Sequence, residues 1–225
     1  MHSSTYSPSK INKYRKKFRQ DNSGYYNGYL HFSSTLILTL GFSIIIFFQL
    51  NNPKFTELIL LPLSFILANL TEYIFHRFPM HNRVPLLDKL FHNHTTLHHY
   101  LFTDDDMELE RVNDVKMALL KPLLLLILTC GLIFPVTLSL YYLYSMNGAL
   151  IFAETTLFYM GLYECFHLFY HLPKESRILK IPIIQYLQSK HALHHKLDQM
   201  KEVNFNIFFP FFDFIFGTST LSQTD

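Results

Sequence analysis

Histidine is the residue type that dominates the candidate chemistry of this sequence, with 13 copies among 225 residues. Ten of the 13 fall into four short motifs, HRFPMH, HTTLHH, HLFYH and HALHH. Neutral imidazole is a good ligand for iron, copper, zinc and nickel. A zinc site uses about four protein ligands, so ten imidazoles predict two metal ions of higher coordination. The candidate ligands are His76, His81, His94, His98, His99, His167, His171, His191, His194 and His195.

The spacing inside the motifs suits helices. HTTLHH, HLFYH and HALHH each contain histidines three or four positions apart, which share one helix face. His76 and His81 are five apart and would diverge on a straight helix, but Pro79 predicts a break that turns His81 back. A lone HxxxH is more often an exposed helix pair than a metal site. Four such motifs together favour a metal site.

The elements that must position these motifs follow from where charged residues are missing. Four long apolar segments carry almost no charge: 32–50, 56–75, 122–146 and 148–172. A bilayer core needs about 20 helical residues to cross it. A soluble bundle would show polar stripes with a period of about 3.6 residues, and the first and third segments show none. The sequence therefore predicts an all-α polytopic membrane protein with about four transmembrane helices, the last two separated by a turn at Asn147-Gly148.

Basic residues predict the orientation of these helices. Of the 19 Lys and Arg residues, only Lys54 would lie on one side of the membrane. The positive-inside rule then makes both termini and the middle loop cytoplasmic. Residues 1–31 are predicted to form a cytoplasmic basic segment. Residues 32–225 are predicted to form one membrane domain with a histidine-rich cytoplasmic cap.

Three further polar residues are candidates for a place beside the histidines. Glu72 comes one helical turn before His76, and Glu164 comes just before His167. Carboxylates commonly orient ligating imidazoles, although both glutamates also suit plain helix capping. Asn204 suits either a bond to a metal-bound water or a turn.

Two other features are given simpler interpretations. The acidic run from Thr103 to Glu108 predicts a helix N-terminus, where carboxylates complement the helix dipole. His2 and His31 stand apart from the four motifs and are predicted to be ordinary surface residues.

The four motifs resemble the histidine boxes of the fatty acid hydroxylase/sterol desaturase superfamily of membrane di-iron enzymes. The closing stretch NFNIFFPFFDFIFGT, residues 204–218, is similar to the C-terminal signature of that family. The resemblance covers about residues 72–218. Asn206 and Phe212 depart from the usual pattern, in which Gly and Trp are common at these places.

The resemblance implies an oxidoreductase that uses O2 to hydroxylate or desaturate a C–H bond of a lipid, such as a fatty acyl chain or a sterol, in lipid biosynthesis. It implies a di-iron centre of two iron ions, or zinc in the isolated protein, with the ten histidines as ligands or near-ligands. The lipid would come from the bilayer. The electrons would come from a separate donor, cytochrome b5-like or a ferredoxin with its reductase, because the chain leaves no room for a fused cytochrome b5-type domain. The membrane would be the bacterial inner membrane or the endoplasmic reticulum.

Other classes of protein fit less well. A divalent-metal transporter would place polar ligands near the bilayer midplane, whereas these motifs lie at the predicted span ends. A soluble di-iron carboxylate bundle needs a pair of Glu-x-x-His motifs, and only Glu164–His167 fits. A net charge of +2 provides no broad basic face for nucleic acid. A catalytically inactive membrane scaffold stays open as an alternative.

Overall fold

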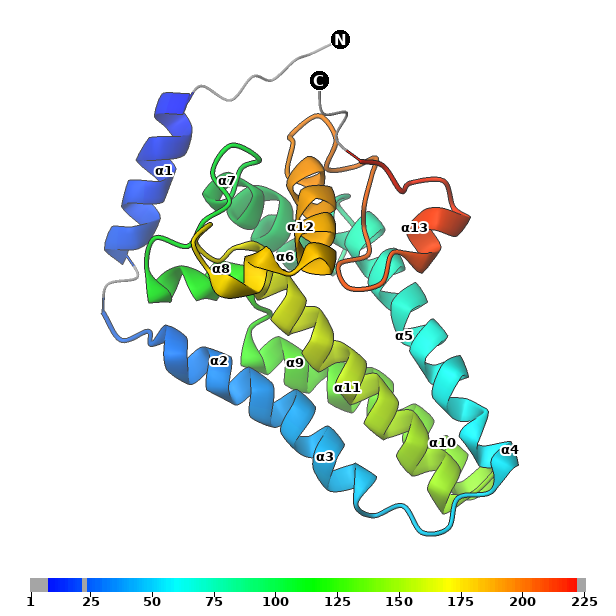
Figure 1. Cartoon of the computed structure of the whole chain (residues 1–225). Coiled ribbons are helices and arrows are strands. Elements are labelled where there is room, and N and C mark those ends of the chain that lie inside the picture. The colour runs from blue at the N-terminus through cyan, green and yellow to red at the C-terminus, as the bar shows by residue number, and fades with distance from the viewer. Residues whose placement is uncertain (1–7, 22–23, 222–225) are drawn as a thin grey trace. The chain divides into compact units, whose positions relative to one another are not determined.

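The computed structural model describes residues 8–21 and 24–221 (Figure 1). These residues form helices and no strand, apart from an isolated bridge between Thr103 and Asp106. The predicted all-α class is therefore confirmed. The chain divides into two compact units, and three of the four boundaries between them fall within helices. Unit 1 comprises Met1–Tyr29, Glu72–Leu119 and Phe166–Asp225, and unit 2 comprises Leu30–Thr71 and Leu120–Cys165.

Unit 2 is built from the long apolar helices of the chain. Short π-helical segments, Ile37–Gly41 and Thr129–Ile133, join α2 to α3 and α9 to α10. The helices are α2 (Gly28–Leu36), α3 (Phe42–Phe47), α4 (Phe55–Leu58), α5 (Leu60–Phe75), α9 (Pro122–Leu128), α10 (Phe134–Leu143) and α11 (Met146–Tyr170).

Helix α11 is the central helix of unit 2. Its Tyr159 packs edge-on against Phe65 of α5, with ring centroids 5.0 Å apart, and accepts a hydrogen bond from Asn69 at 2.6 Å. Its Gly161 lies against Leu40. Leu157 belongs to a buried cluster that includes Ile133, Phe152 and Ala153. Contacts on several sides allow α11 to carry polar residues at positions where the outer helices are apolar.

Among the described residues, three helices are long and apolar enough to cross a membrane: Gly28–Phe47, Phe55–Met80 and Val112–Leu143. They overlap the first three predicted spans, and Phe55–Met80 contains the whole of the second. Helix α11 has 25 residues, enough to span a bilayer, but is not one of these three. Its polar side chains, among them Glu154 with a 3.2 Å bond from Ser43, lower its apolar character. The fourth transmembrane helix, like the membrane orientation, stays a prediction.

The break before α11 falls earlier than the sequence predicts. Helix α10 ends at Leu143 and α11 begins at Met146, so Asn147 and Gly148 lie in its first turn instead of between two helices. The amide of Asn147 binds the backbone of Asn51 from both its oxygen, at 3.1 Å, and its nitrogen, at 2.9 Å. The Asn147 side chain, which suggested a turn, therefore links the start of α11 to Asn51.

Unit 1 contains shorter helices and the histidine motifs. A π-helical segment, His76–Met80, follows α5, and a second, His92–His98, leads into α7. Single 3-10 turns occupy Val112–Asp114 and Arg177–Lys180. Its helices are α1 (Pro8–Asp21), α6 (Asp88–Phe91), α7 (His99–Leu101), α8 (Val115–Ala118), α12 (Pro182–His194) and α13 (Phe211–Ile215).

Two of the simpler sequence interpretations are wrong. No helix begins within Thr103–Glu108, where Thr103 and Asp106 instead exchange backbone hydrogen bonds in a turn. His31 is buried, and its Nε2 lies 2.9 Å from the carbonyl oxygen of Leu120, which explains a polar residue inside an apolar helix. His2 lies outside the described residues.

Candidate metal centre

The ten predicted ligands all converge inside unit 1. In each of three overlapping groups, the candidate ligand atoms lie within 4.8 Å of one another. We call the first group the pentad: His98, His167, His171, His191 and His195. The second, the tetrad, consists of His76, His81, His94 and His194, and a third group joins His99 to His94 and His98. Nine of the ten side chains are buried, and His94 is partly exposed.

Helix ends supply these side chains, and two of the ends are π-helical. Hydrogen bonds from i to i+5 widen the turn, so residues four and five positions apart both lie close together. The ring centroids of His76 and His81 are therefore 5.2 Å apart, and those of His94 lie 4.9 Å from both His98 and His99. Pro79 lies inside the first segment, which ends one residue later at Met80, so the helix ends close to the predicted break. The π-helical turn, and not a break at Pro79, brings the rings of His76 and His81 together. The π-helical turns themselves were not predicted.

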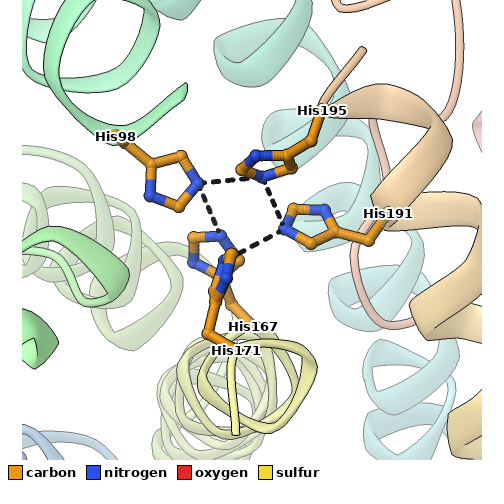
Figure 2. A group of neighbouring side chains, drawn as sticks. All are labelled: His98, His167, His171, His191 and His195. Atoms are coloured by element: carbon orange, nitrogen blue, oxygen red, sulfur yellow. Dashed lines mark hydrogen bonds between the residues drawn. The ribbon is translucent and has the colours of Figure 1, made fainter. Parts of the chain in front are cut away.

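Figure 2 shows the rings of the pentad turned inward, with their Nε2 atoms facing one another. The Nε2 atoms of His98 and His195 are 3.1 Å apart, and those of His195 and His191 are 3.0 Å apart. His167 lies 3.3 Å from His98, and His171 lies 3.4 Å from His191, between the same ring atoms. These separations are those of neighbouring nitrogen ligands around one ion, each about 2.1 Å from it.

The tetrad repeats this arrangement. Nε2 of His76 is 2.9 Å from Nε2 of His94, and Nε2 of His81 is 3.0 Å from Nε2 of His194. Nε2 of His99 lies 3.3 Å from that of His94, and the His99 ring stacks on His195 with centroids 4.2 Å apart. His99 therefore lies where it touches members of both groups.

The other ring nitrogen, Nδ1, has a separate partner in most of these histidines. Nδ1 of His98 donates to the carbonyl of Met117 at 2.8 Å, and Nδ1 of His195 donates to that of Phe102 at 2.7 Å. Backbone carbonyls also accept from His76, His171 and His194, and His167 bonds the backbone of Ala118. Such bonds place the hydrogen on Nδ1 and leave Nε2 with a lone pair.

Where both rings of a facing pair donate from Nδ1, their Nε2 atoms cannot bond to each other through hydrogen. In the pair His98 and His195, both rings donate from Nδ1, so two lone pairs face each other at 3.1 Å. Two facing lone pairs repel unless a cation lies between them. The donor set, neutral imidazoles held in one tautomer by carbonyl partners, is the set that transition metals bind. The residues present thus fit a metal centre.

Two different backbone segments hold the two groups. The chain from Phe102 to Ala118 supplies the carbonyl partners of four pentad histidines. Val203 and Phe205 supply those of His194 and His76 in the tetrad. Nδ1 of His99 and of His191 is buried without a hydrogen-bond partner among the described residues. Both groups can therefore be disturbed separately.

Burial keeps these imidazoles neutral. For the seven outside the membrane-spanning segments, removal from water lowers the pKa below its ordinary value, and it lowers the pKa of His195 to about 3. A neutral ring is the form that binds a metal. The seven are His81, His94, His98, His99, His191, His194 and His195.

Glu72 contacts the C-terminal segment. Its carboxylate accepts hydrogen bonds from the backbone N–H of Ile207 at 2.5 Å and from the Asn206 side chain at 3.1 Å. These residues adjoin Phe205, whose carbonyl accepts from His76. Glu72 thus holds the segment that orients His76, although its role as a residue beside a metal stays a prediction.

Asp213 holds the same segment and was not singled out in the sequence. It is fully buried and accepts hydrogen bonds from the N–H groups of Phe205, at 2.9 Å, and Asn206, at 2.7 Å. The Thr218 hydroxyl donates to it at 2.7 Å. The similarity of the final stretch to the C-terminal signature was the available signal. In physical terms, Asp213 holds the segment whose Val203 and Phe205 carbonyls accept hydrogen bonds from His194 and His76.

Asn204 has a left-handed backbone, with φ 56°, and its amide links α12 to the last described residues. Its Nδ2 donates to the carbonyls of Lys190 and Thr220 at 3.0 and 2.9 Å, and its Oδ1 accepts from the N–H of Thr220 at 2.9 Å. These contacts support the turn. A bond from Asn204 to a metal-bound water stays a prediction.

Glu164 is buried in unit 2. One carboxylate oxygen accepts a hydrogen bond from the N–H of Leu120 at 3.0 Å, and the other has no hydrogen-bond partner among the described residues. This bond holds the chain ahead of α9. A role of Glu164 in orienting a histidine also stays a prediction.

The fold and the site define a class: a helical protein with helices fit to cross a membrane and a buried histidine cluster fit to bind metal. Comparison with protein families gives a match to the fatty acid hydroxylase family over residues 61–218, which includes all ten histidines. The chain belongs to this family, so the resemblance seen in its motifs is confirmed. Neither the curated proteins nor the solved structures gave a match.

Proposed function

We propose that this protein is an integral-membrane di-iron oxidoreductase that uses O2 to hydroxylate, or desaturate, a C–H bond of a lipid such as a fatty acyl chain or a sterol. The observation that carries the proposal is the pair of histidine groups whose Nε2 lone pairs face one another. Membership of the fatty acid hydroxylase family supports the reaction class.

In this proposal, the pentad would hold one iron ion, and the tetrad with His99 the other. Non-haem iron with open coordination positions supplies O2 activation, which zinc, without redox chemistry, does not. The chain's own residues keep the imidazoles neutral by burial, fix their tautomer through backbone carbonyls, and exclude water from around the rings. Zinc in an isolated preparation would then be a substitution at the same nitrogen ligands.

The proposal extends to the surroundings of the protein. The lipid would enter from the bilayer, and electrons would come from a separate cytochrome b5-like protein or a ferredoxin and its reductase. Both termini would be cytoplasmic, in the bacterial inner membrane or the endoplasmic reticulum. The distribution of basic residues supports this orientation.

The test is lipid oxidation by the purified protein after iron loading, with a reductant and O2. Membrane lipids are analysed by mass spectrometry for added oxygen or lost hydrogen. We expect oxidised lipid from the wild type and none from His98→Ala/His194→Ala, with equal membrane insertion. Equal oxidation by both proteins would contradict the site. Iron-loaded wild type that oxidises none of a panel of acyl chains and sterols would contradict the enzyme and leave a scaffold.

A further inference from the structure

The chain from Phe102 to Ala118 supplies backbone carbonyls as hydrogen-bond acceptors to four of the five pentad histidines. Most of it is irregular, with only a 3-10 turn and the four-residue α8 near its end. Short irregular segments have little local structure to keep their carbonyls in place. Something outside the segment must therefore hold it.

Arg15 of α1 is one such restraint. Its side chain is buried, and its Nε donates to the carbonyl of Leu101 at 2.9 Å, next to the Phe102 carbonyl that binds His195. Its other guanidinium nitrogens donate to the Thr103 hydroxyl at 3.1 Å and to the Asp106 carboxylate at 2.5 Å. A guanidinium presents several donors in one rigid plane, so a single side chain fixes Leu101, just before the segment, and both Thr103 and Asp106 within it.

Arg19, one turn later on α1, restrains the other end. It donates to the buried carboxylate of Asp114 at 3.0 Å and forms an ion pair with Glu110 at 2.6 Å. Asp114 in turn accepts from the N–H groups of Glu110 and Arg111, at 3.2 and 3.3 Å. It directly precedes α8, which carries the carbonyls of Met117 and Ala118.

Only some of the basic residues of α1 contact the Phe102–Ala118 segment, so their role differs from that of exposed surface charges. Lys16 and Lys17, beside Arg15 on the chain, are exposed. The helix also lies outside residues 61–218, the part of the chain that matches the family.

We propose that Arg15 and Arg19 of α1 are positioning residues for the metal centre, acting through the carbonyls of Phe102–Ala118. The inference rests on the proposed function, since it takes the pentad to be a metal site. It predicts that the N-terminal basic helix controls how tightly the pentad retains its ion.

The test uses the full-length protein in detergent. Arg15→Met and Arg19→Met are compared with Lys16→Met and Lys17→Met, which remove equal charge from the exposed face. One readout is the rate at which a chelator removes the metal. Another is hydrogen exchange of the Phe102–Ala118 amides in metal-free protein, with α12 as the internal reference. We expect the arginine variants to lose part of their metal about tenfold faster and to exchange faster in Phe102–Ala118 alone, with the lysine variants unchanged.

Further variants keep the test decisive if Arg15→Met does not fold. Arg15→Lys retains the charge but not the rigid fork, and Asp106→Asn weakens one bond at a partly exposed partner; both should give smaller increases than Arg15→Met. Equal behaviour of arginine and lysine variants would overturn the proposal, as would equal acceleration of exchange in α12. Wild type without bound metal would contradict the proposed function, while the exchange data would still test the restraint.

Discussion

The Nε2 atoms of His81 and His194 lie 3.0 Å apart, and neither carries the hydrogen that would join them. Nδ1 of His194 donates to the carbonyl of Val203 at 2.8 Å. Nδ1 of His81 lies 3.0 Å from the Thr95 hydroxyl, whose own hydrogen goes to the carbonyl of Met80. Two residues 113 positions apart are thus oriented toward one point by separate partners, a threonine hydroxyl for His81 and a backbone carbonyl for His194. A cation at that point would relieve the repulsion of the facing lone pairs.

Removing one tetrad ligand should affect metal binding selectively. We expect His81→Ala to retain about one ion per chain instead of two, because its ring belongs to the tetrad and not to the pentad. His92→Ala is the matched control, since His92 is exposed and belongs to neither group. Elemental analysis of both variants measures the loss. Equal metal content in the two variants would show that His81 is not a ligand.

Acid should destabilise the metal-free protein. Burial lowers the folded-state pKa of histidines such as His98 and His195, so below about pH 6.5 the unfolded chain binds protons that the folded chain does not. Stability is then constant with respect to these groups above that pH and falls below it, by about 1.4 kcal/mol per pH unit for each such histidine. The part of this loss of stability that comes from His195 ends near pH 3, its folded-state pKa.

Thermal melting of the metal-free protein at several pH values between about 7.5 and 5 tests this sign. His195→Gln, which cannot titrate, should show a shallower decline than the wild type. A melting temperature that stays level or rises on acidification would contradict the prediction.

Asp213→Asn should loosen the segment that holds the tetrad. The new amide group cannot accept from the N–H groups of both Phe205 and Asn206, and one buried donor loses its partner. We expect a loss of about 2–3 kcal/mol in the free energy of unfolding. Denaturant unfolding measures it against Asp198→Asn, at an exposed residue. An unchanged stability in Asp213→Asn would mean that these bonds do not hold the segment.

Two glycines of unit 2 allow a packing test. A Cβ at Gly161 would lie 2.5 Å from Leu40 Cδ2 and 2.9 Å from Thr39 Oγ1, whereas a Cβ at Gly131 meets nothing within 4 Å. Gly161→Ala should therefore destabilise the helices of unit 2 by about 1–3 kcal/mol. Gly131→Ala should not. The same melting temperature for both variants would contradict the close packing of α11.

Residue type and spacing were enough to predict the ten histidines as one site. Imidazoles at the ends of helices have few other uses in such number, and Pro79 indicated that the helix ends close to His81. The carbonyl partners could not be predicted in the same way, because every residue has a carbonyl and only the folded backbone decides which one faces a ring. The contact of Arg15 with Leu101, 86 residues later, lies beyond any local pattern.

The apolar helices show the complementary limit. Long runs without charge predicted spans at 32–50, 56–75 and 122–146, which overlap the three helices long and apolar enough to cross a membrane, because length and lack of charge can be read directly from the sequence. Helix α11 packs against other helices of unit 2. Its residues Glu154, Tyr159 and Gly161 therefore make contacts that cannot be read from the sequence. The turn predicted at Asn147-Gly148 lies earlier in the chain, before Met146, and the Asn147 amide instead binds the backbone of Asn51.

The number of metal ions per chain in freshly purified wild-type protein, measured by elemental analysis beside His98→Ala/His194→Ala, tests the two-metal centre directly. The two facing histidine groups predict about two ions per chain, lost from both sites in the double variant, with iron as the metal in protein loaded for activity. Wild-type protein that binds no metal after incubation with ferrous iron would contradict a metal centre at these histidines, because the ring nitrogens would then face one another with nothing between them.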